Sequence, residues 1–207
     1  MTAARSGIVS ASYLRSFSEP EEMRPYMPEA ACEVLAEGYE AGKFPADPEK
    51  LATAVLAKLR TLSEEDFARL PDCAAEGFYH RVYDAARKAG TLSEFYELAK
   101  TKRYAMSRIR RIAAAAFTGM DLSVLNLGGP PYCRVLAMNE TGAAVLKEAA
   151  QHPTGIPILC SLADLEKTSP EAALFAELES RAEDLYQLCL PYPGPCGMEY
   201  RWQVIRE

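Results

Sequence analysis

The stretch KTKRYAMSRIRRIAAAAFTG, residues 100–119, has the pattern of an amphipathic helix with one apolar and one basic face. At 3.6 residues per turn, one arc carries Met106, Ile109, Ile112, Ala113, Ala116 and Phe117. The opposite arc carries Arg103, Ser107, Arg108, Arg110 and Arg111. This spacing predicts a helix over residues 103–118, ended by Gly119, that buries the apolar arc and exposes the basic one.

The same stretch concentrates positive charge in a chain whose formal net charge is −6. Residues 100–111 hold six cationic side chains and no acidic one, and no acidic residue lies between Glu97 and Asp121. Exposed helix faces usually mix Glu with Lys or Arg, because oppositely charged pairs one turn apart stabilise a helix. A basic face without acidic partners is therefore typical of a surface that binds a polyanion.

Six residues of this stretch are candidates for binding nucleic acid: Lys100, Lys102, Arg103, Arg108, Arg110 and Arg111. We expect them to bind backbone phosphates rather than to read bases. Arg103 and Arg110 would contact one stretch of backbone, and Arg108 with Arg111 an adjoining one. An Arg at the edge of the arc can instead pair with an acid elsewhere in the fold. Two alternatives remain open: a solvated helix face, and a face that binds an acidic protein.

Upstream of this stretch the sequence predicts further helices. Helical apolar periods cover residues 28–42, 47–62, 73–90 and 91–101. Ser93 is the expected N-cap of the last of these helices. A capping box, SEED at residues 63–66, predicts a short helix that ends before Pro71.

Downstream the pattern changes from helical to mixed. Two segments with strand character, residues 131–139 and 155–162, are joined by a segment with a helical pattern. Two strands joined by a helix predict a small parallel βαβ element near residues 131–165. A long helix over residues 169–190 and a tail rich in Pro and Gly follow. The predicted fold class is therefore mainly α, a helical domain with a small βαβ element.

Composition is that of an ordinary globular protein, with 207 residues, 49% apolar and 25% charged. No run of 18 apolar residues predicts a membrane span, and the N-terminal segment lacks the apolar core of a secretory signal. The six Cys are unclustered and only two His are present. We therefore expect reduced and mostly buried thiols, no metal site and a cytoplasmic location. No catalytic triad or phosphate-binding glycine loop stands out, so no catalytic residue is assigned.

A second candidate site lies in SGIVSASYLRSF, residues 6–17, which reads as the end of a strand turning into a helix. Ser10 and Ser12 lie near the expected helix N-terminus, and Arg15 lies on its first turn. Free backbone N–H groups, two hydroxyls and a guanidinium can together hold a phosphate. Because Ser is a common helix cap, an ordinary cap is the alternative.

Three segments resemble, in collinear order, the bacterial tRNA(Met) cytidine acetate ligase family. EGFYHRVYDAARKAGTLSEFYELAKTKRYAMSRIRRIAAAAFTGM, residues 76–120, is similar to that family's E-G-x-x-x-R-x-x-x-A, S-x-x-E-L, K-T-K-R-Y and R-I-x-R pattern. PPYCRVLAMNETGAAVLKE, residues 130–148, resembles the segment that follows. SASYLR, residues 10–15, resembles the family's S-A-T-x-I-R motif, which lies beside the bound nucleotide. The resemblance covers almost the whole chain, and KTKRY followed by RIRR is its most specific part.

The resemblance implies a protein that activates acetate with ATP and acetylates N4 of the wobble cytidine of elongator tRNA(Met). It implies a nucleotidyltransferase half with an H-x-G-H motif and a mainly helical half that helps to hold the tRNA. The six basic residues would then contact tRNA, while Ser10, Ser12 and Arg15 would be nucleotide-proximal. ATP would belong to the complete family protein, with no cofactor held by this chain alone.

The chain departs from the family pattern in one major respect, because it contains no H-x-G-H. Residues 1–17 are therefore expected to be the remnant edge of a nucleotidyltransferase domain, with Ser10, Ser12 and Arg15 exposed. Residues 18–207 are expected to be a helical tRNA-binding domain. The chain alone would be inactive, whether it is a fragment, a truncated reading frame or a half whose nucleotidyltransferase partner is a separate polypeptide. The alternative is a non-enzymatic helical interaction module whose basic face binds an acidic partner.

Overall fold

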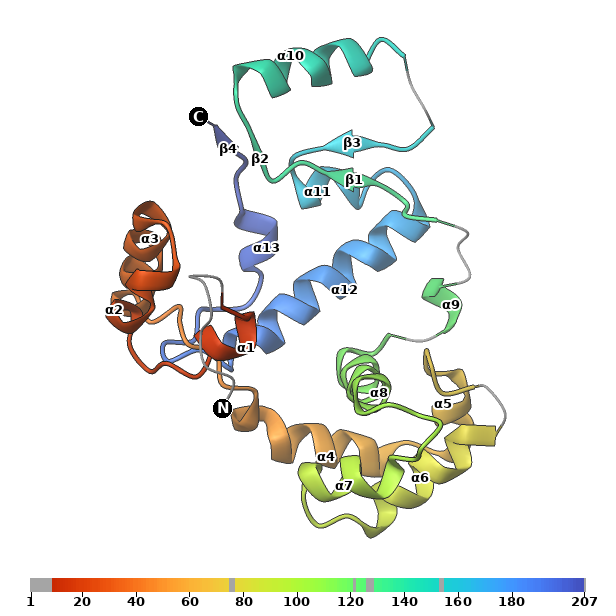
Figure 1. Ribbon diagram of the computed structural model, residues 1–207. Helices are drawn as coiled ribbons and strands as arrows, with labels where there is room; N and C mark the ends of the chain where they lie inside the picture. Colours follow the sequence, from red (N-terminus) through yellow and green to blue (C-terminus); the bar gives the residue numbers. More distant parts are fainter. Residues whose placement is uncertain (1–8, 75–76, 121, 126–128, 153–154, 207) are drawn as a thin grey trace.

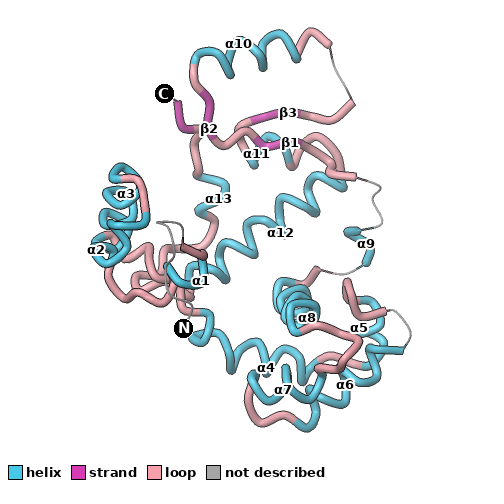
Figure 2. The backbone as a smooth tube through the Cα atoms, viewed as in Figure 1, coloured by secondary structure: helices cyan, strands magenta, loops and turns pink. Residues whose placement is uncertain are grey.

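The computed structural model describes residues 9–74, 77–120, 122–125, 129–152 and 155–206, which form a mainly helical fold (Figures 1 and 2). The helices lie in an N-terminal group, a lobe of five helices from the middle of the chain (the central lobe, at the bottom of Figure 1) and a C-terminal group built on one long helix. Short parallel strands accompany the C-terminal group. The described residues are therefore mostly helical, which supports the predicted mainly α class in part.

The central lobe surrounds one apolar core. Its helices are α4 (Ala52–Thr61), α5 (Glu64–Arg69), α6 (Phe78–Lys88), α7 (Leu92–Ala99) and α8 (Met106–Thr118). A 3-10 turn, η2 (Pro48–Leu51), leads into α4. Fully buried side chains include Leu59, Phe67, Val82, Phe95 and Ile112. Each large apolar side chain contributes roughly 1.5–3 kcal/mol on burial, which matters because helices this short are marginal alone.

The helix α8 follows the predicted pattern but begins later than residue 103. The hydroxyl of Thr101 accepts hydrogen bonds from the backbone N–H groups of Arg103 and Tyr104 at 3.2 and 3.0 Å, so the chain turns before the helix begins. The helix ends at Thr118, and Gly119 caps it in the left-handed conformation with φ of 80°. The predicted C-terminus of this helix is confirmed.

Two other helix starts differ from the prediction, and one agrees with it. The helix α6 begins at Phe78 rather than near residue 73, because Gly77 precedes it with φ of 72°. The N-cap of α7 is Thr91 and not Ser93, since the Thr91 hydroxyl accepts from the N–H of Glu94 at 3.1 Å. The capping box that begins at Ser63 is present as predicted.

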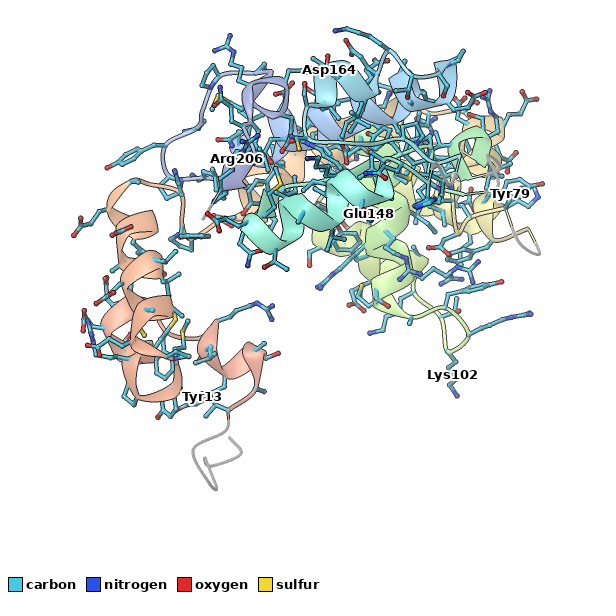
Figure 3. All side chains as sticks on the ribbon, turned by 90° about the horizontal axis from the view of Figure 1, so that it is seen from above. Tyr13, Tyr79, Lys102, Glu148, Asp164 and Arg206 are labelled. Carbon is cyan, nitrogen blue, oxygen red and sulfur yellow. The ribbon has the colours of Figure 1, made fainter. Side chains whose placement is uncertain are left out.

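The N-terminal group contains α1 (Ala11–Leu14), α2 (Pro20–Met23), a 3-10 turn η1 (Arg24–Tyr26) and α3 (Glu29–Glu40). The rings of Tyr13, Phe17 and Tyr26 pack together with centroids 5.1–5.9 Å apart. Figure 3 shows Tyr13 at the end of this group that lies farthest from the rest of the molecule. Tyr13 and Phe17, from the segment 1–17, thus pack with Tyr26, from the segment 18–207, in one small aromatic cluster.

The C-terminal group is organised by α12 (Pro170–Gln187), which matches the long helix predicted over residues 169–190. Two short helices, α11 (Leu162–Leu165) and α13 (Met198–Arg201), pack against it. A second core lies here, formed by Tyr132, Leu162, Leu165, Ala172 and Ala176. Another short helix, α9 (Leu122–Leu125), lies between α8 and the strands along the chain.

The predicted βαβ element is present in a reduced form. Strand β1 (Cys133–Arg134) pairs in parallel with β3 (Ile158–Leu159), and α10 (Glu140–Ala149) lies between them along the chain. The segment predicted as one strand over 131–139 divides into β1 and β2 (Ala137–Met138). Strand β2 pairs in parallel with β4 (Ile205–Arg206), in the tail for which no strand was predicted. A single segment therefore serves two different sheets.

The cysteines are less uniformly buried than predicted. Cys32, Cys73 and Cys189 are buried, Cys160 is half-buried, and Cys133 and Cys196 are exposed. Burial raises the pKa of the Cys73 thiol to about 12, which keeps this thiol protonated near neutral pH. No helix in the described part of the chain combines the length and the hydropathy that crossing a membrane requires.

The junction between α8 and α12 depends on Gly119 and Arg181. The guanidinium of Arg181, on α12, donates to the carbonyl oxygen of Thr118 in the last turn of α8 at 3.0 Å. A cation at this place also complements the negative end of the helix dipole. A Cβ on Gly119 would lie 2.7 Å from Nη1 of Arg181. Gly119 therefore both ends α8 and leaves room for the Arg181 contact.

We expect Gly119→Ala to lower the free energy of unfolding more than Gly197→Ala does. Both glycines have positive φ, 80° and 78°, so both substitutions place Ala in the left-handed region. A Cβ at Gly197 meets no atom within 4 Å, whereas one at Gly119 displaces Arg181. The lost hydrogen bond should add about 1 kcal/mol, measured by urea unfolding. Equal losses in the two variants would contradict a role for the Arg181 contact.

Candidate nucleic-acid interface

The outward side of α8 and the loop before it present most of the predicted basic residues. Ile109, Ile112, Ala113 and Ala116 are buried as predicted, whereas Met106 and Phe117 are only half-buried. Five of the six basic residues are exposed: Lys100, Lys102, Arg103, Arg110 and Arg111. Figure 3 shows Lys102 at the tip of its loop, pointing away from the fold. The helix therefore separates an apolar inner side from a cationic outer side.

Aromatic rings lie under several of these guanidinium groups. Arg108 lies over the ring of Tyr104 at 4.7 Å, and Arg110 lies over the ring of Tyr96 at 5.8 Å. Arg103 approaches Tyr104 at 5.8 Å. Such cation–π contacts are worth about 0.5–1 kcal/mol at exposed sites and limit the number of orientations of the side chain. Tyr96 lies on α7, and the sequence pattern gives no sign that it meets Arg110.

Asp72 engages two of the predicted residues and corrects the expectation of a face without acidic partners. The Nε atom of Arg111 lies 2.7 Å from a carboxylate oxygen of Asp72. The Nε–H of Arg108 donates to the backbone carbonyl of Asp72, also at 2.7 Å. Lys100 forms a longer ion pair with Glu97, at 3.8 Å. Asp72 was missed because it lies 39 positions before Arg111 and meets it only through the packing of the lobe.

The backbone at Asp72 is held in an uncommon conformation, with φ of 63°. Only Gly, and to a lesser degree Asn and Asp, adopt this conformation readily. The sequence does contain a turn signal here, the Pro71–Asp72 pair, but that signal names no partner. Arg108 and Arg111 therefore contribute to holding this turn against α8, besides any role toward a ligand.

The second predicted site, Ser10, Ser12 and Arg15, is exposed at α1. Ser10 caps α1 by accepting a hydrogen bond from the N–H of Tyr13 at 3.2 Å. Arg15 lines a cavity of about 600 Å³ whose wall is largely apolar and includes its sequence neighbours Leu14 and, two positions on, Phe17. Ser10 therefore acts as a helix cap, and Arg15 lies beside a largely apolar cavity. The nucleotide-proximal role of the three residues stays a prediction.

Comparison with known proteins places these features in a family. Residues 1–196 match the family model described as HIGH Nucleotidyl Transferase. A tRNA(Met) cytidine acetate ligase of Acetivibrio thermocellus is 30% identical over 95% of this chain and 48% of its own length. A protein of the same name from Fervidobacterium nodosum is 29% identical over 89% of this chain and 48% of its own length. The chain thus spans about half the length of these relatives.

Solved structures show the same fold. The crystal structure of Thermotoga maritima TmcAL bound with alpha-thio ATP superposes with a TM-score of 0.85 at 22% identity. The superposition covers 98% of this chain and 53% of that protein. An apo form of the same protein gives a TM-score of 0.84 at 23% identity, covering all of this chain and 53% of that one. At this level of identity the likeness establishes the fold alone.

We expect Asp72→Ala to lower the free energy of unfolding by about 1–2 kcal/mol more than Asp72→Asn does. Both variants lose the ion pair with Arg111, but only Ala is strained at φ of 63°. Asp72→Gly serves as a control, because Gly has no Cβ and adopts this φ freely. Urea unfolding of the three variants is the measurement. If Ala and Gly prove equally stable, the φ of residue 72 does not constrain the turn.

Proposed function

The chain belongs to the HIGH nucleotidyl transferase family, and from that premise we propose that it is the tRNA-binding portion of a tRNA(Met) cytidine acetate ligase-like protein. The relatives that bear this name support the proposal. The complete protein would activate acetate with ATP and acetylate N4 of the wobble cytidine of elongator tRNA(Met) in the cytoplasm. This chain would supply the surface that holds the tRNA.

The outward basic side of α8 is the observation that carries the proposal. Arg110 is exposed on it and Lys102 and Arg103 are exposed on the loop before it, and aromatic rings lie under the two guanidinium groups. Each cation that meets a phosphate releases condensed counterions, which is the main sequence-independent source of affinity for nucleic acid. Guanidinium planes also stack on unpaired bases, as a tRNA loop presents them. Both properties suit a folded RNA.

Nucleotide chemistry would be supplied from outside the residues of this chain. The sequence contains no H-x-G-H motif, and its two His lie far apart in the sequence, at positions 80 and 152. Ser10, Ser12 and Arg15 offer two hydroxyls and one guanidinium, but the cavity next to Arg15 is too apolar to hold a triphosphate by itself. These three residues would form one edge of an ATP site that a nucleotidyltransferase portion completes. The chain alone would therefore lack ligase activity.

A second candidate function is binding of an acidic protein. One observation favours it: Arg108 and Arg111 already bind a carboxylate-bearing residue, Asp72. An acidic peptide could present similar groups to the rest of the basic side. Binding assays with tRNA and with an acidic protein bait, run over a range of salt concentrations, distinguish the two functions. Binding of the bait but not of tRNA at low salt would overturn the proposal.

Reversing two charges tests the basic side directly. We expect Arg103→Glu combined with Arg110→Glu to weaken tRNA binding at least about tenfold, since two phosphate contacts become repulsive. The slope of log K against log salt should become shallower by roughly 0.7–0.9 for each lost contact. Of the two positions only Arg110 lies in α8, and Glu is a good helix former like Arg, so α8 should remain folded. Lys43→Glu with Lys147→Glu is the control, because it makes the same charge change at exposed positions elsewhere. Unchanged affinity and slope would contradict the proposal.

Asp72→Asn tests the opposite change at the same surface. Removal of the carboxylate releases Arg111 for a phosphate, so tRNA should bind more tightly, with a salt slope steeper by roughly 0.7–0.9. Asn tolerates the positive φ of residue 72, so the turn should persist. Filter binding of tRNA at several salt concentrations provides the readout. Unchanged affinity and an unchanged slope for this variant would exclude Arg111 from the interface.

A further inference from the structure

One face of α12 forms the floor of a groove made of two adjoining cavities. The residues on this face follow a three-and-four spacing and are Phe175, Leu178, Glu179, Ala182, Glu183 and Tyr186. They line two adjoining cavities of about 580 and 680 Å³, which share Glu179 and Ala182. The smaller cavity also touches Arg111 on α8. The groove therefore leads from the basic helix toward the strands.

A buried arginine forms one wall of the larger cavity. The side chain of Arg134, on β1, is only 8% exposed. Its Nη2 donates to the backbone carbonyl of Glu199 at 3.0 Å, and its Nη1 contacts the Glu199 carboxylate and lies 3.6 Å from that of Glu179. Within the described part of the chain, its buried Nε has no hydrogen-bond partner. Leaving a buried polar atom without a partner is costly, so this arrangement calls for an explanation such as a ligand bound in the cavity.

The same cavity is rich in hydrogen-bond acceptors. Glu179 accepts from the hydroxyl of Tyr132 at 3.0 Å, and Glu183 accepts from the side-chain amide of Gln187. Each contact uses one oxygen, and every carboxylate has a second. The pKa of Tyr132 is raised by burial and by the Glu179 carboxylate, so this hydroxyl stays neutral. The carboxylates of Glu179, Glu183 and Glu199 outnumber the single guanidinium of Arg134, so the wall of the cavity has a net negative charge.

An aromatic ring stands beside these polar groups. Tyr186 lines the cavity and is 46% exposed, so its ring can meet a ligand that enters. The wall thus combines carboxylate acceptors, guanidinium donors and an aromatic face. A planar heterocycle matches this combination, because it can stack on the ring while its edge forms hydrogen bonds. Phosphates do not match, because the carboxylates repel them.

We propose that this cavity binds one unstacked RNA base and prefers a base with an exocyclic amino group over uracil. The proposal rests on the proposed function, in which the RNA backbone lies along the basic side of α8. The amino group would donate to the carboxylate of Glu183, as amino groups of cytosine do to carboxylates elsewhere. The guanidinium of Arg134 would face the ring acceptors, and Tyr186 would stack on the base. Phosphate contacts position the RNA, and this cavity adds base selectivity.

The test compares two pyrimidine oligonucleotides of equal length, oligocytidylate and oligouridylate, on the full chain. Their phosphate contacts are the same, so the ratio of the two dissociation constants isolates the contribution of the base. We expect oligocytidylate to bind at least about fivefold more tightly. Glu183→Met should bring this ratio close to one, because Met keeps the length and helix preference of Glu but cannot accept a hydrogen bond in this way.

Glu177→Met is the matched control, since it removes a carboxylate from α12 at a position that does not line the groove. It should leave the ratio unchanged. Tyr186→Ala, at a half-exposed position, should weaken oligocytidylate more than oligouridylate. Far-UV circular dichroism and urea unfolding establish that each variant is folded.

Three outcomes overturn the inference. A ratio of one for the unmodified chain shows that there is no base preference and overturns the inference. If the Arg103 and Arg110 reversal still weakens binding of both oligonucleotides, the proposed function holds without the base site. Binding of spermidine that Glu183→Met abolishes, together with a ratio of one, makes the cavity a cation site instead. Absence of binding to tRNA and to both oligonucleotides overturns the proposed function and this inference together.

Discussion

Burial of one face of α8 is the constraint on which the rest of the structure depends. Ile109 and Ile112 are fully buried, and the helix packs against α4, α7 and α12. Ala113 and Ala116 have short side chains on that face, so neighbouring helices can approach it closely. With its apolar face held inward, the helix cannot rotate, and the Arg side chains at positions 110 and 111 must lie outward. The packing that closes the central lobe therefore also creates the basic surface.

The basic surface is partly neutralised from within the protein. The carboxylate of Asp72 pairs with Arg111, and the backbone carbonyl of Asp72 accepts a hydrogen bond from the Nε–H of Arg108. Exposed ion pairs of this kind contribute little to stability, about 0–1 kcal/mol, so a polyanion can replace the carboxylate at small cost. Arg110, by contrast, lies over Tyr96 and remains exposed. A ligand would therefore have to displace Asp72 to reach Arg108 and Arg111, whereas Arg110 already faces solvent.

The long helix α12 serves two structural roles. One side supports the second core through Ala172 and Ala176, and Arg181 joins the helix to the end of α8. A different side forms the floor of the groove and bears Glu179 and Glu183. Opposite charges are therefore placed on neighbouring elements, basic on α8 and acidic in the groove. For an RNA ligand, this separation would direct phosphates to one element and bases to the other.

The sequence by itself determined the features that depend on residues within a few turns of one another. The apolar period predicted α8 and its basic side, Gly119 predicted where that helix ends, and the capping box at Ser63 and the long C-terminal helix were also predicted. The parallel βαβ element was predicted from alternating strand and helix patterns. Local propensity was sufficient for these features, because hydrogen bonding and periodicity in a helix involve neighbours three or four positions apart.

Only the tertiary structure decided which distant residues meet. Asp72 contacts Arg108 across 36 positions, Arg134 contacts Glu199 across 65, and β2 pairs with the tail strand β4. Each of these contacts involves groups whose local sequence is compatible with many partners. The choice among them is made by how the helices pack, which depends on the summed burial of all the core side chains and not on any one segment. For the same reason, the groove along α12 and the buried Arg134 could not be found from the sequence pattern alone.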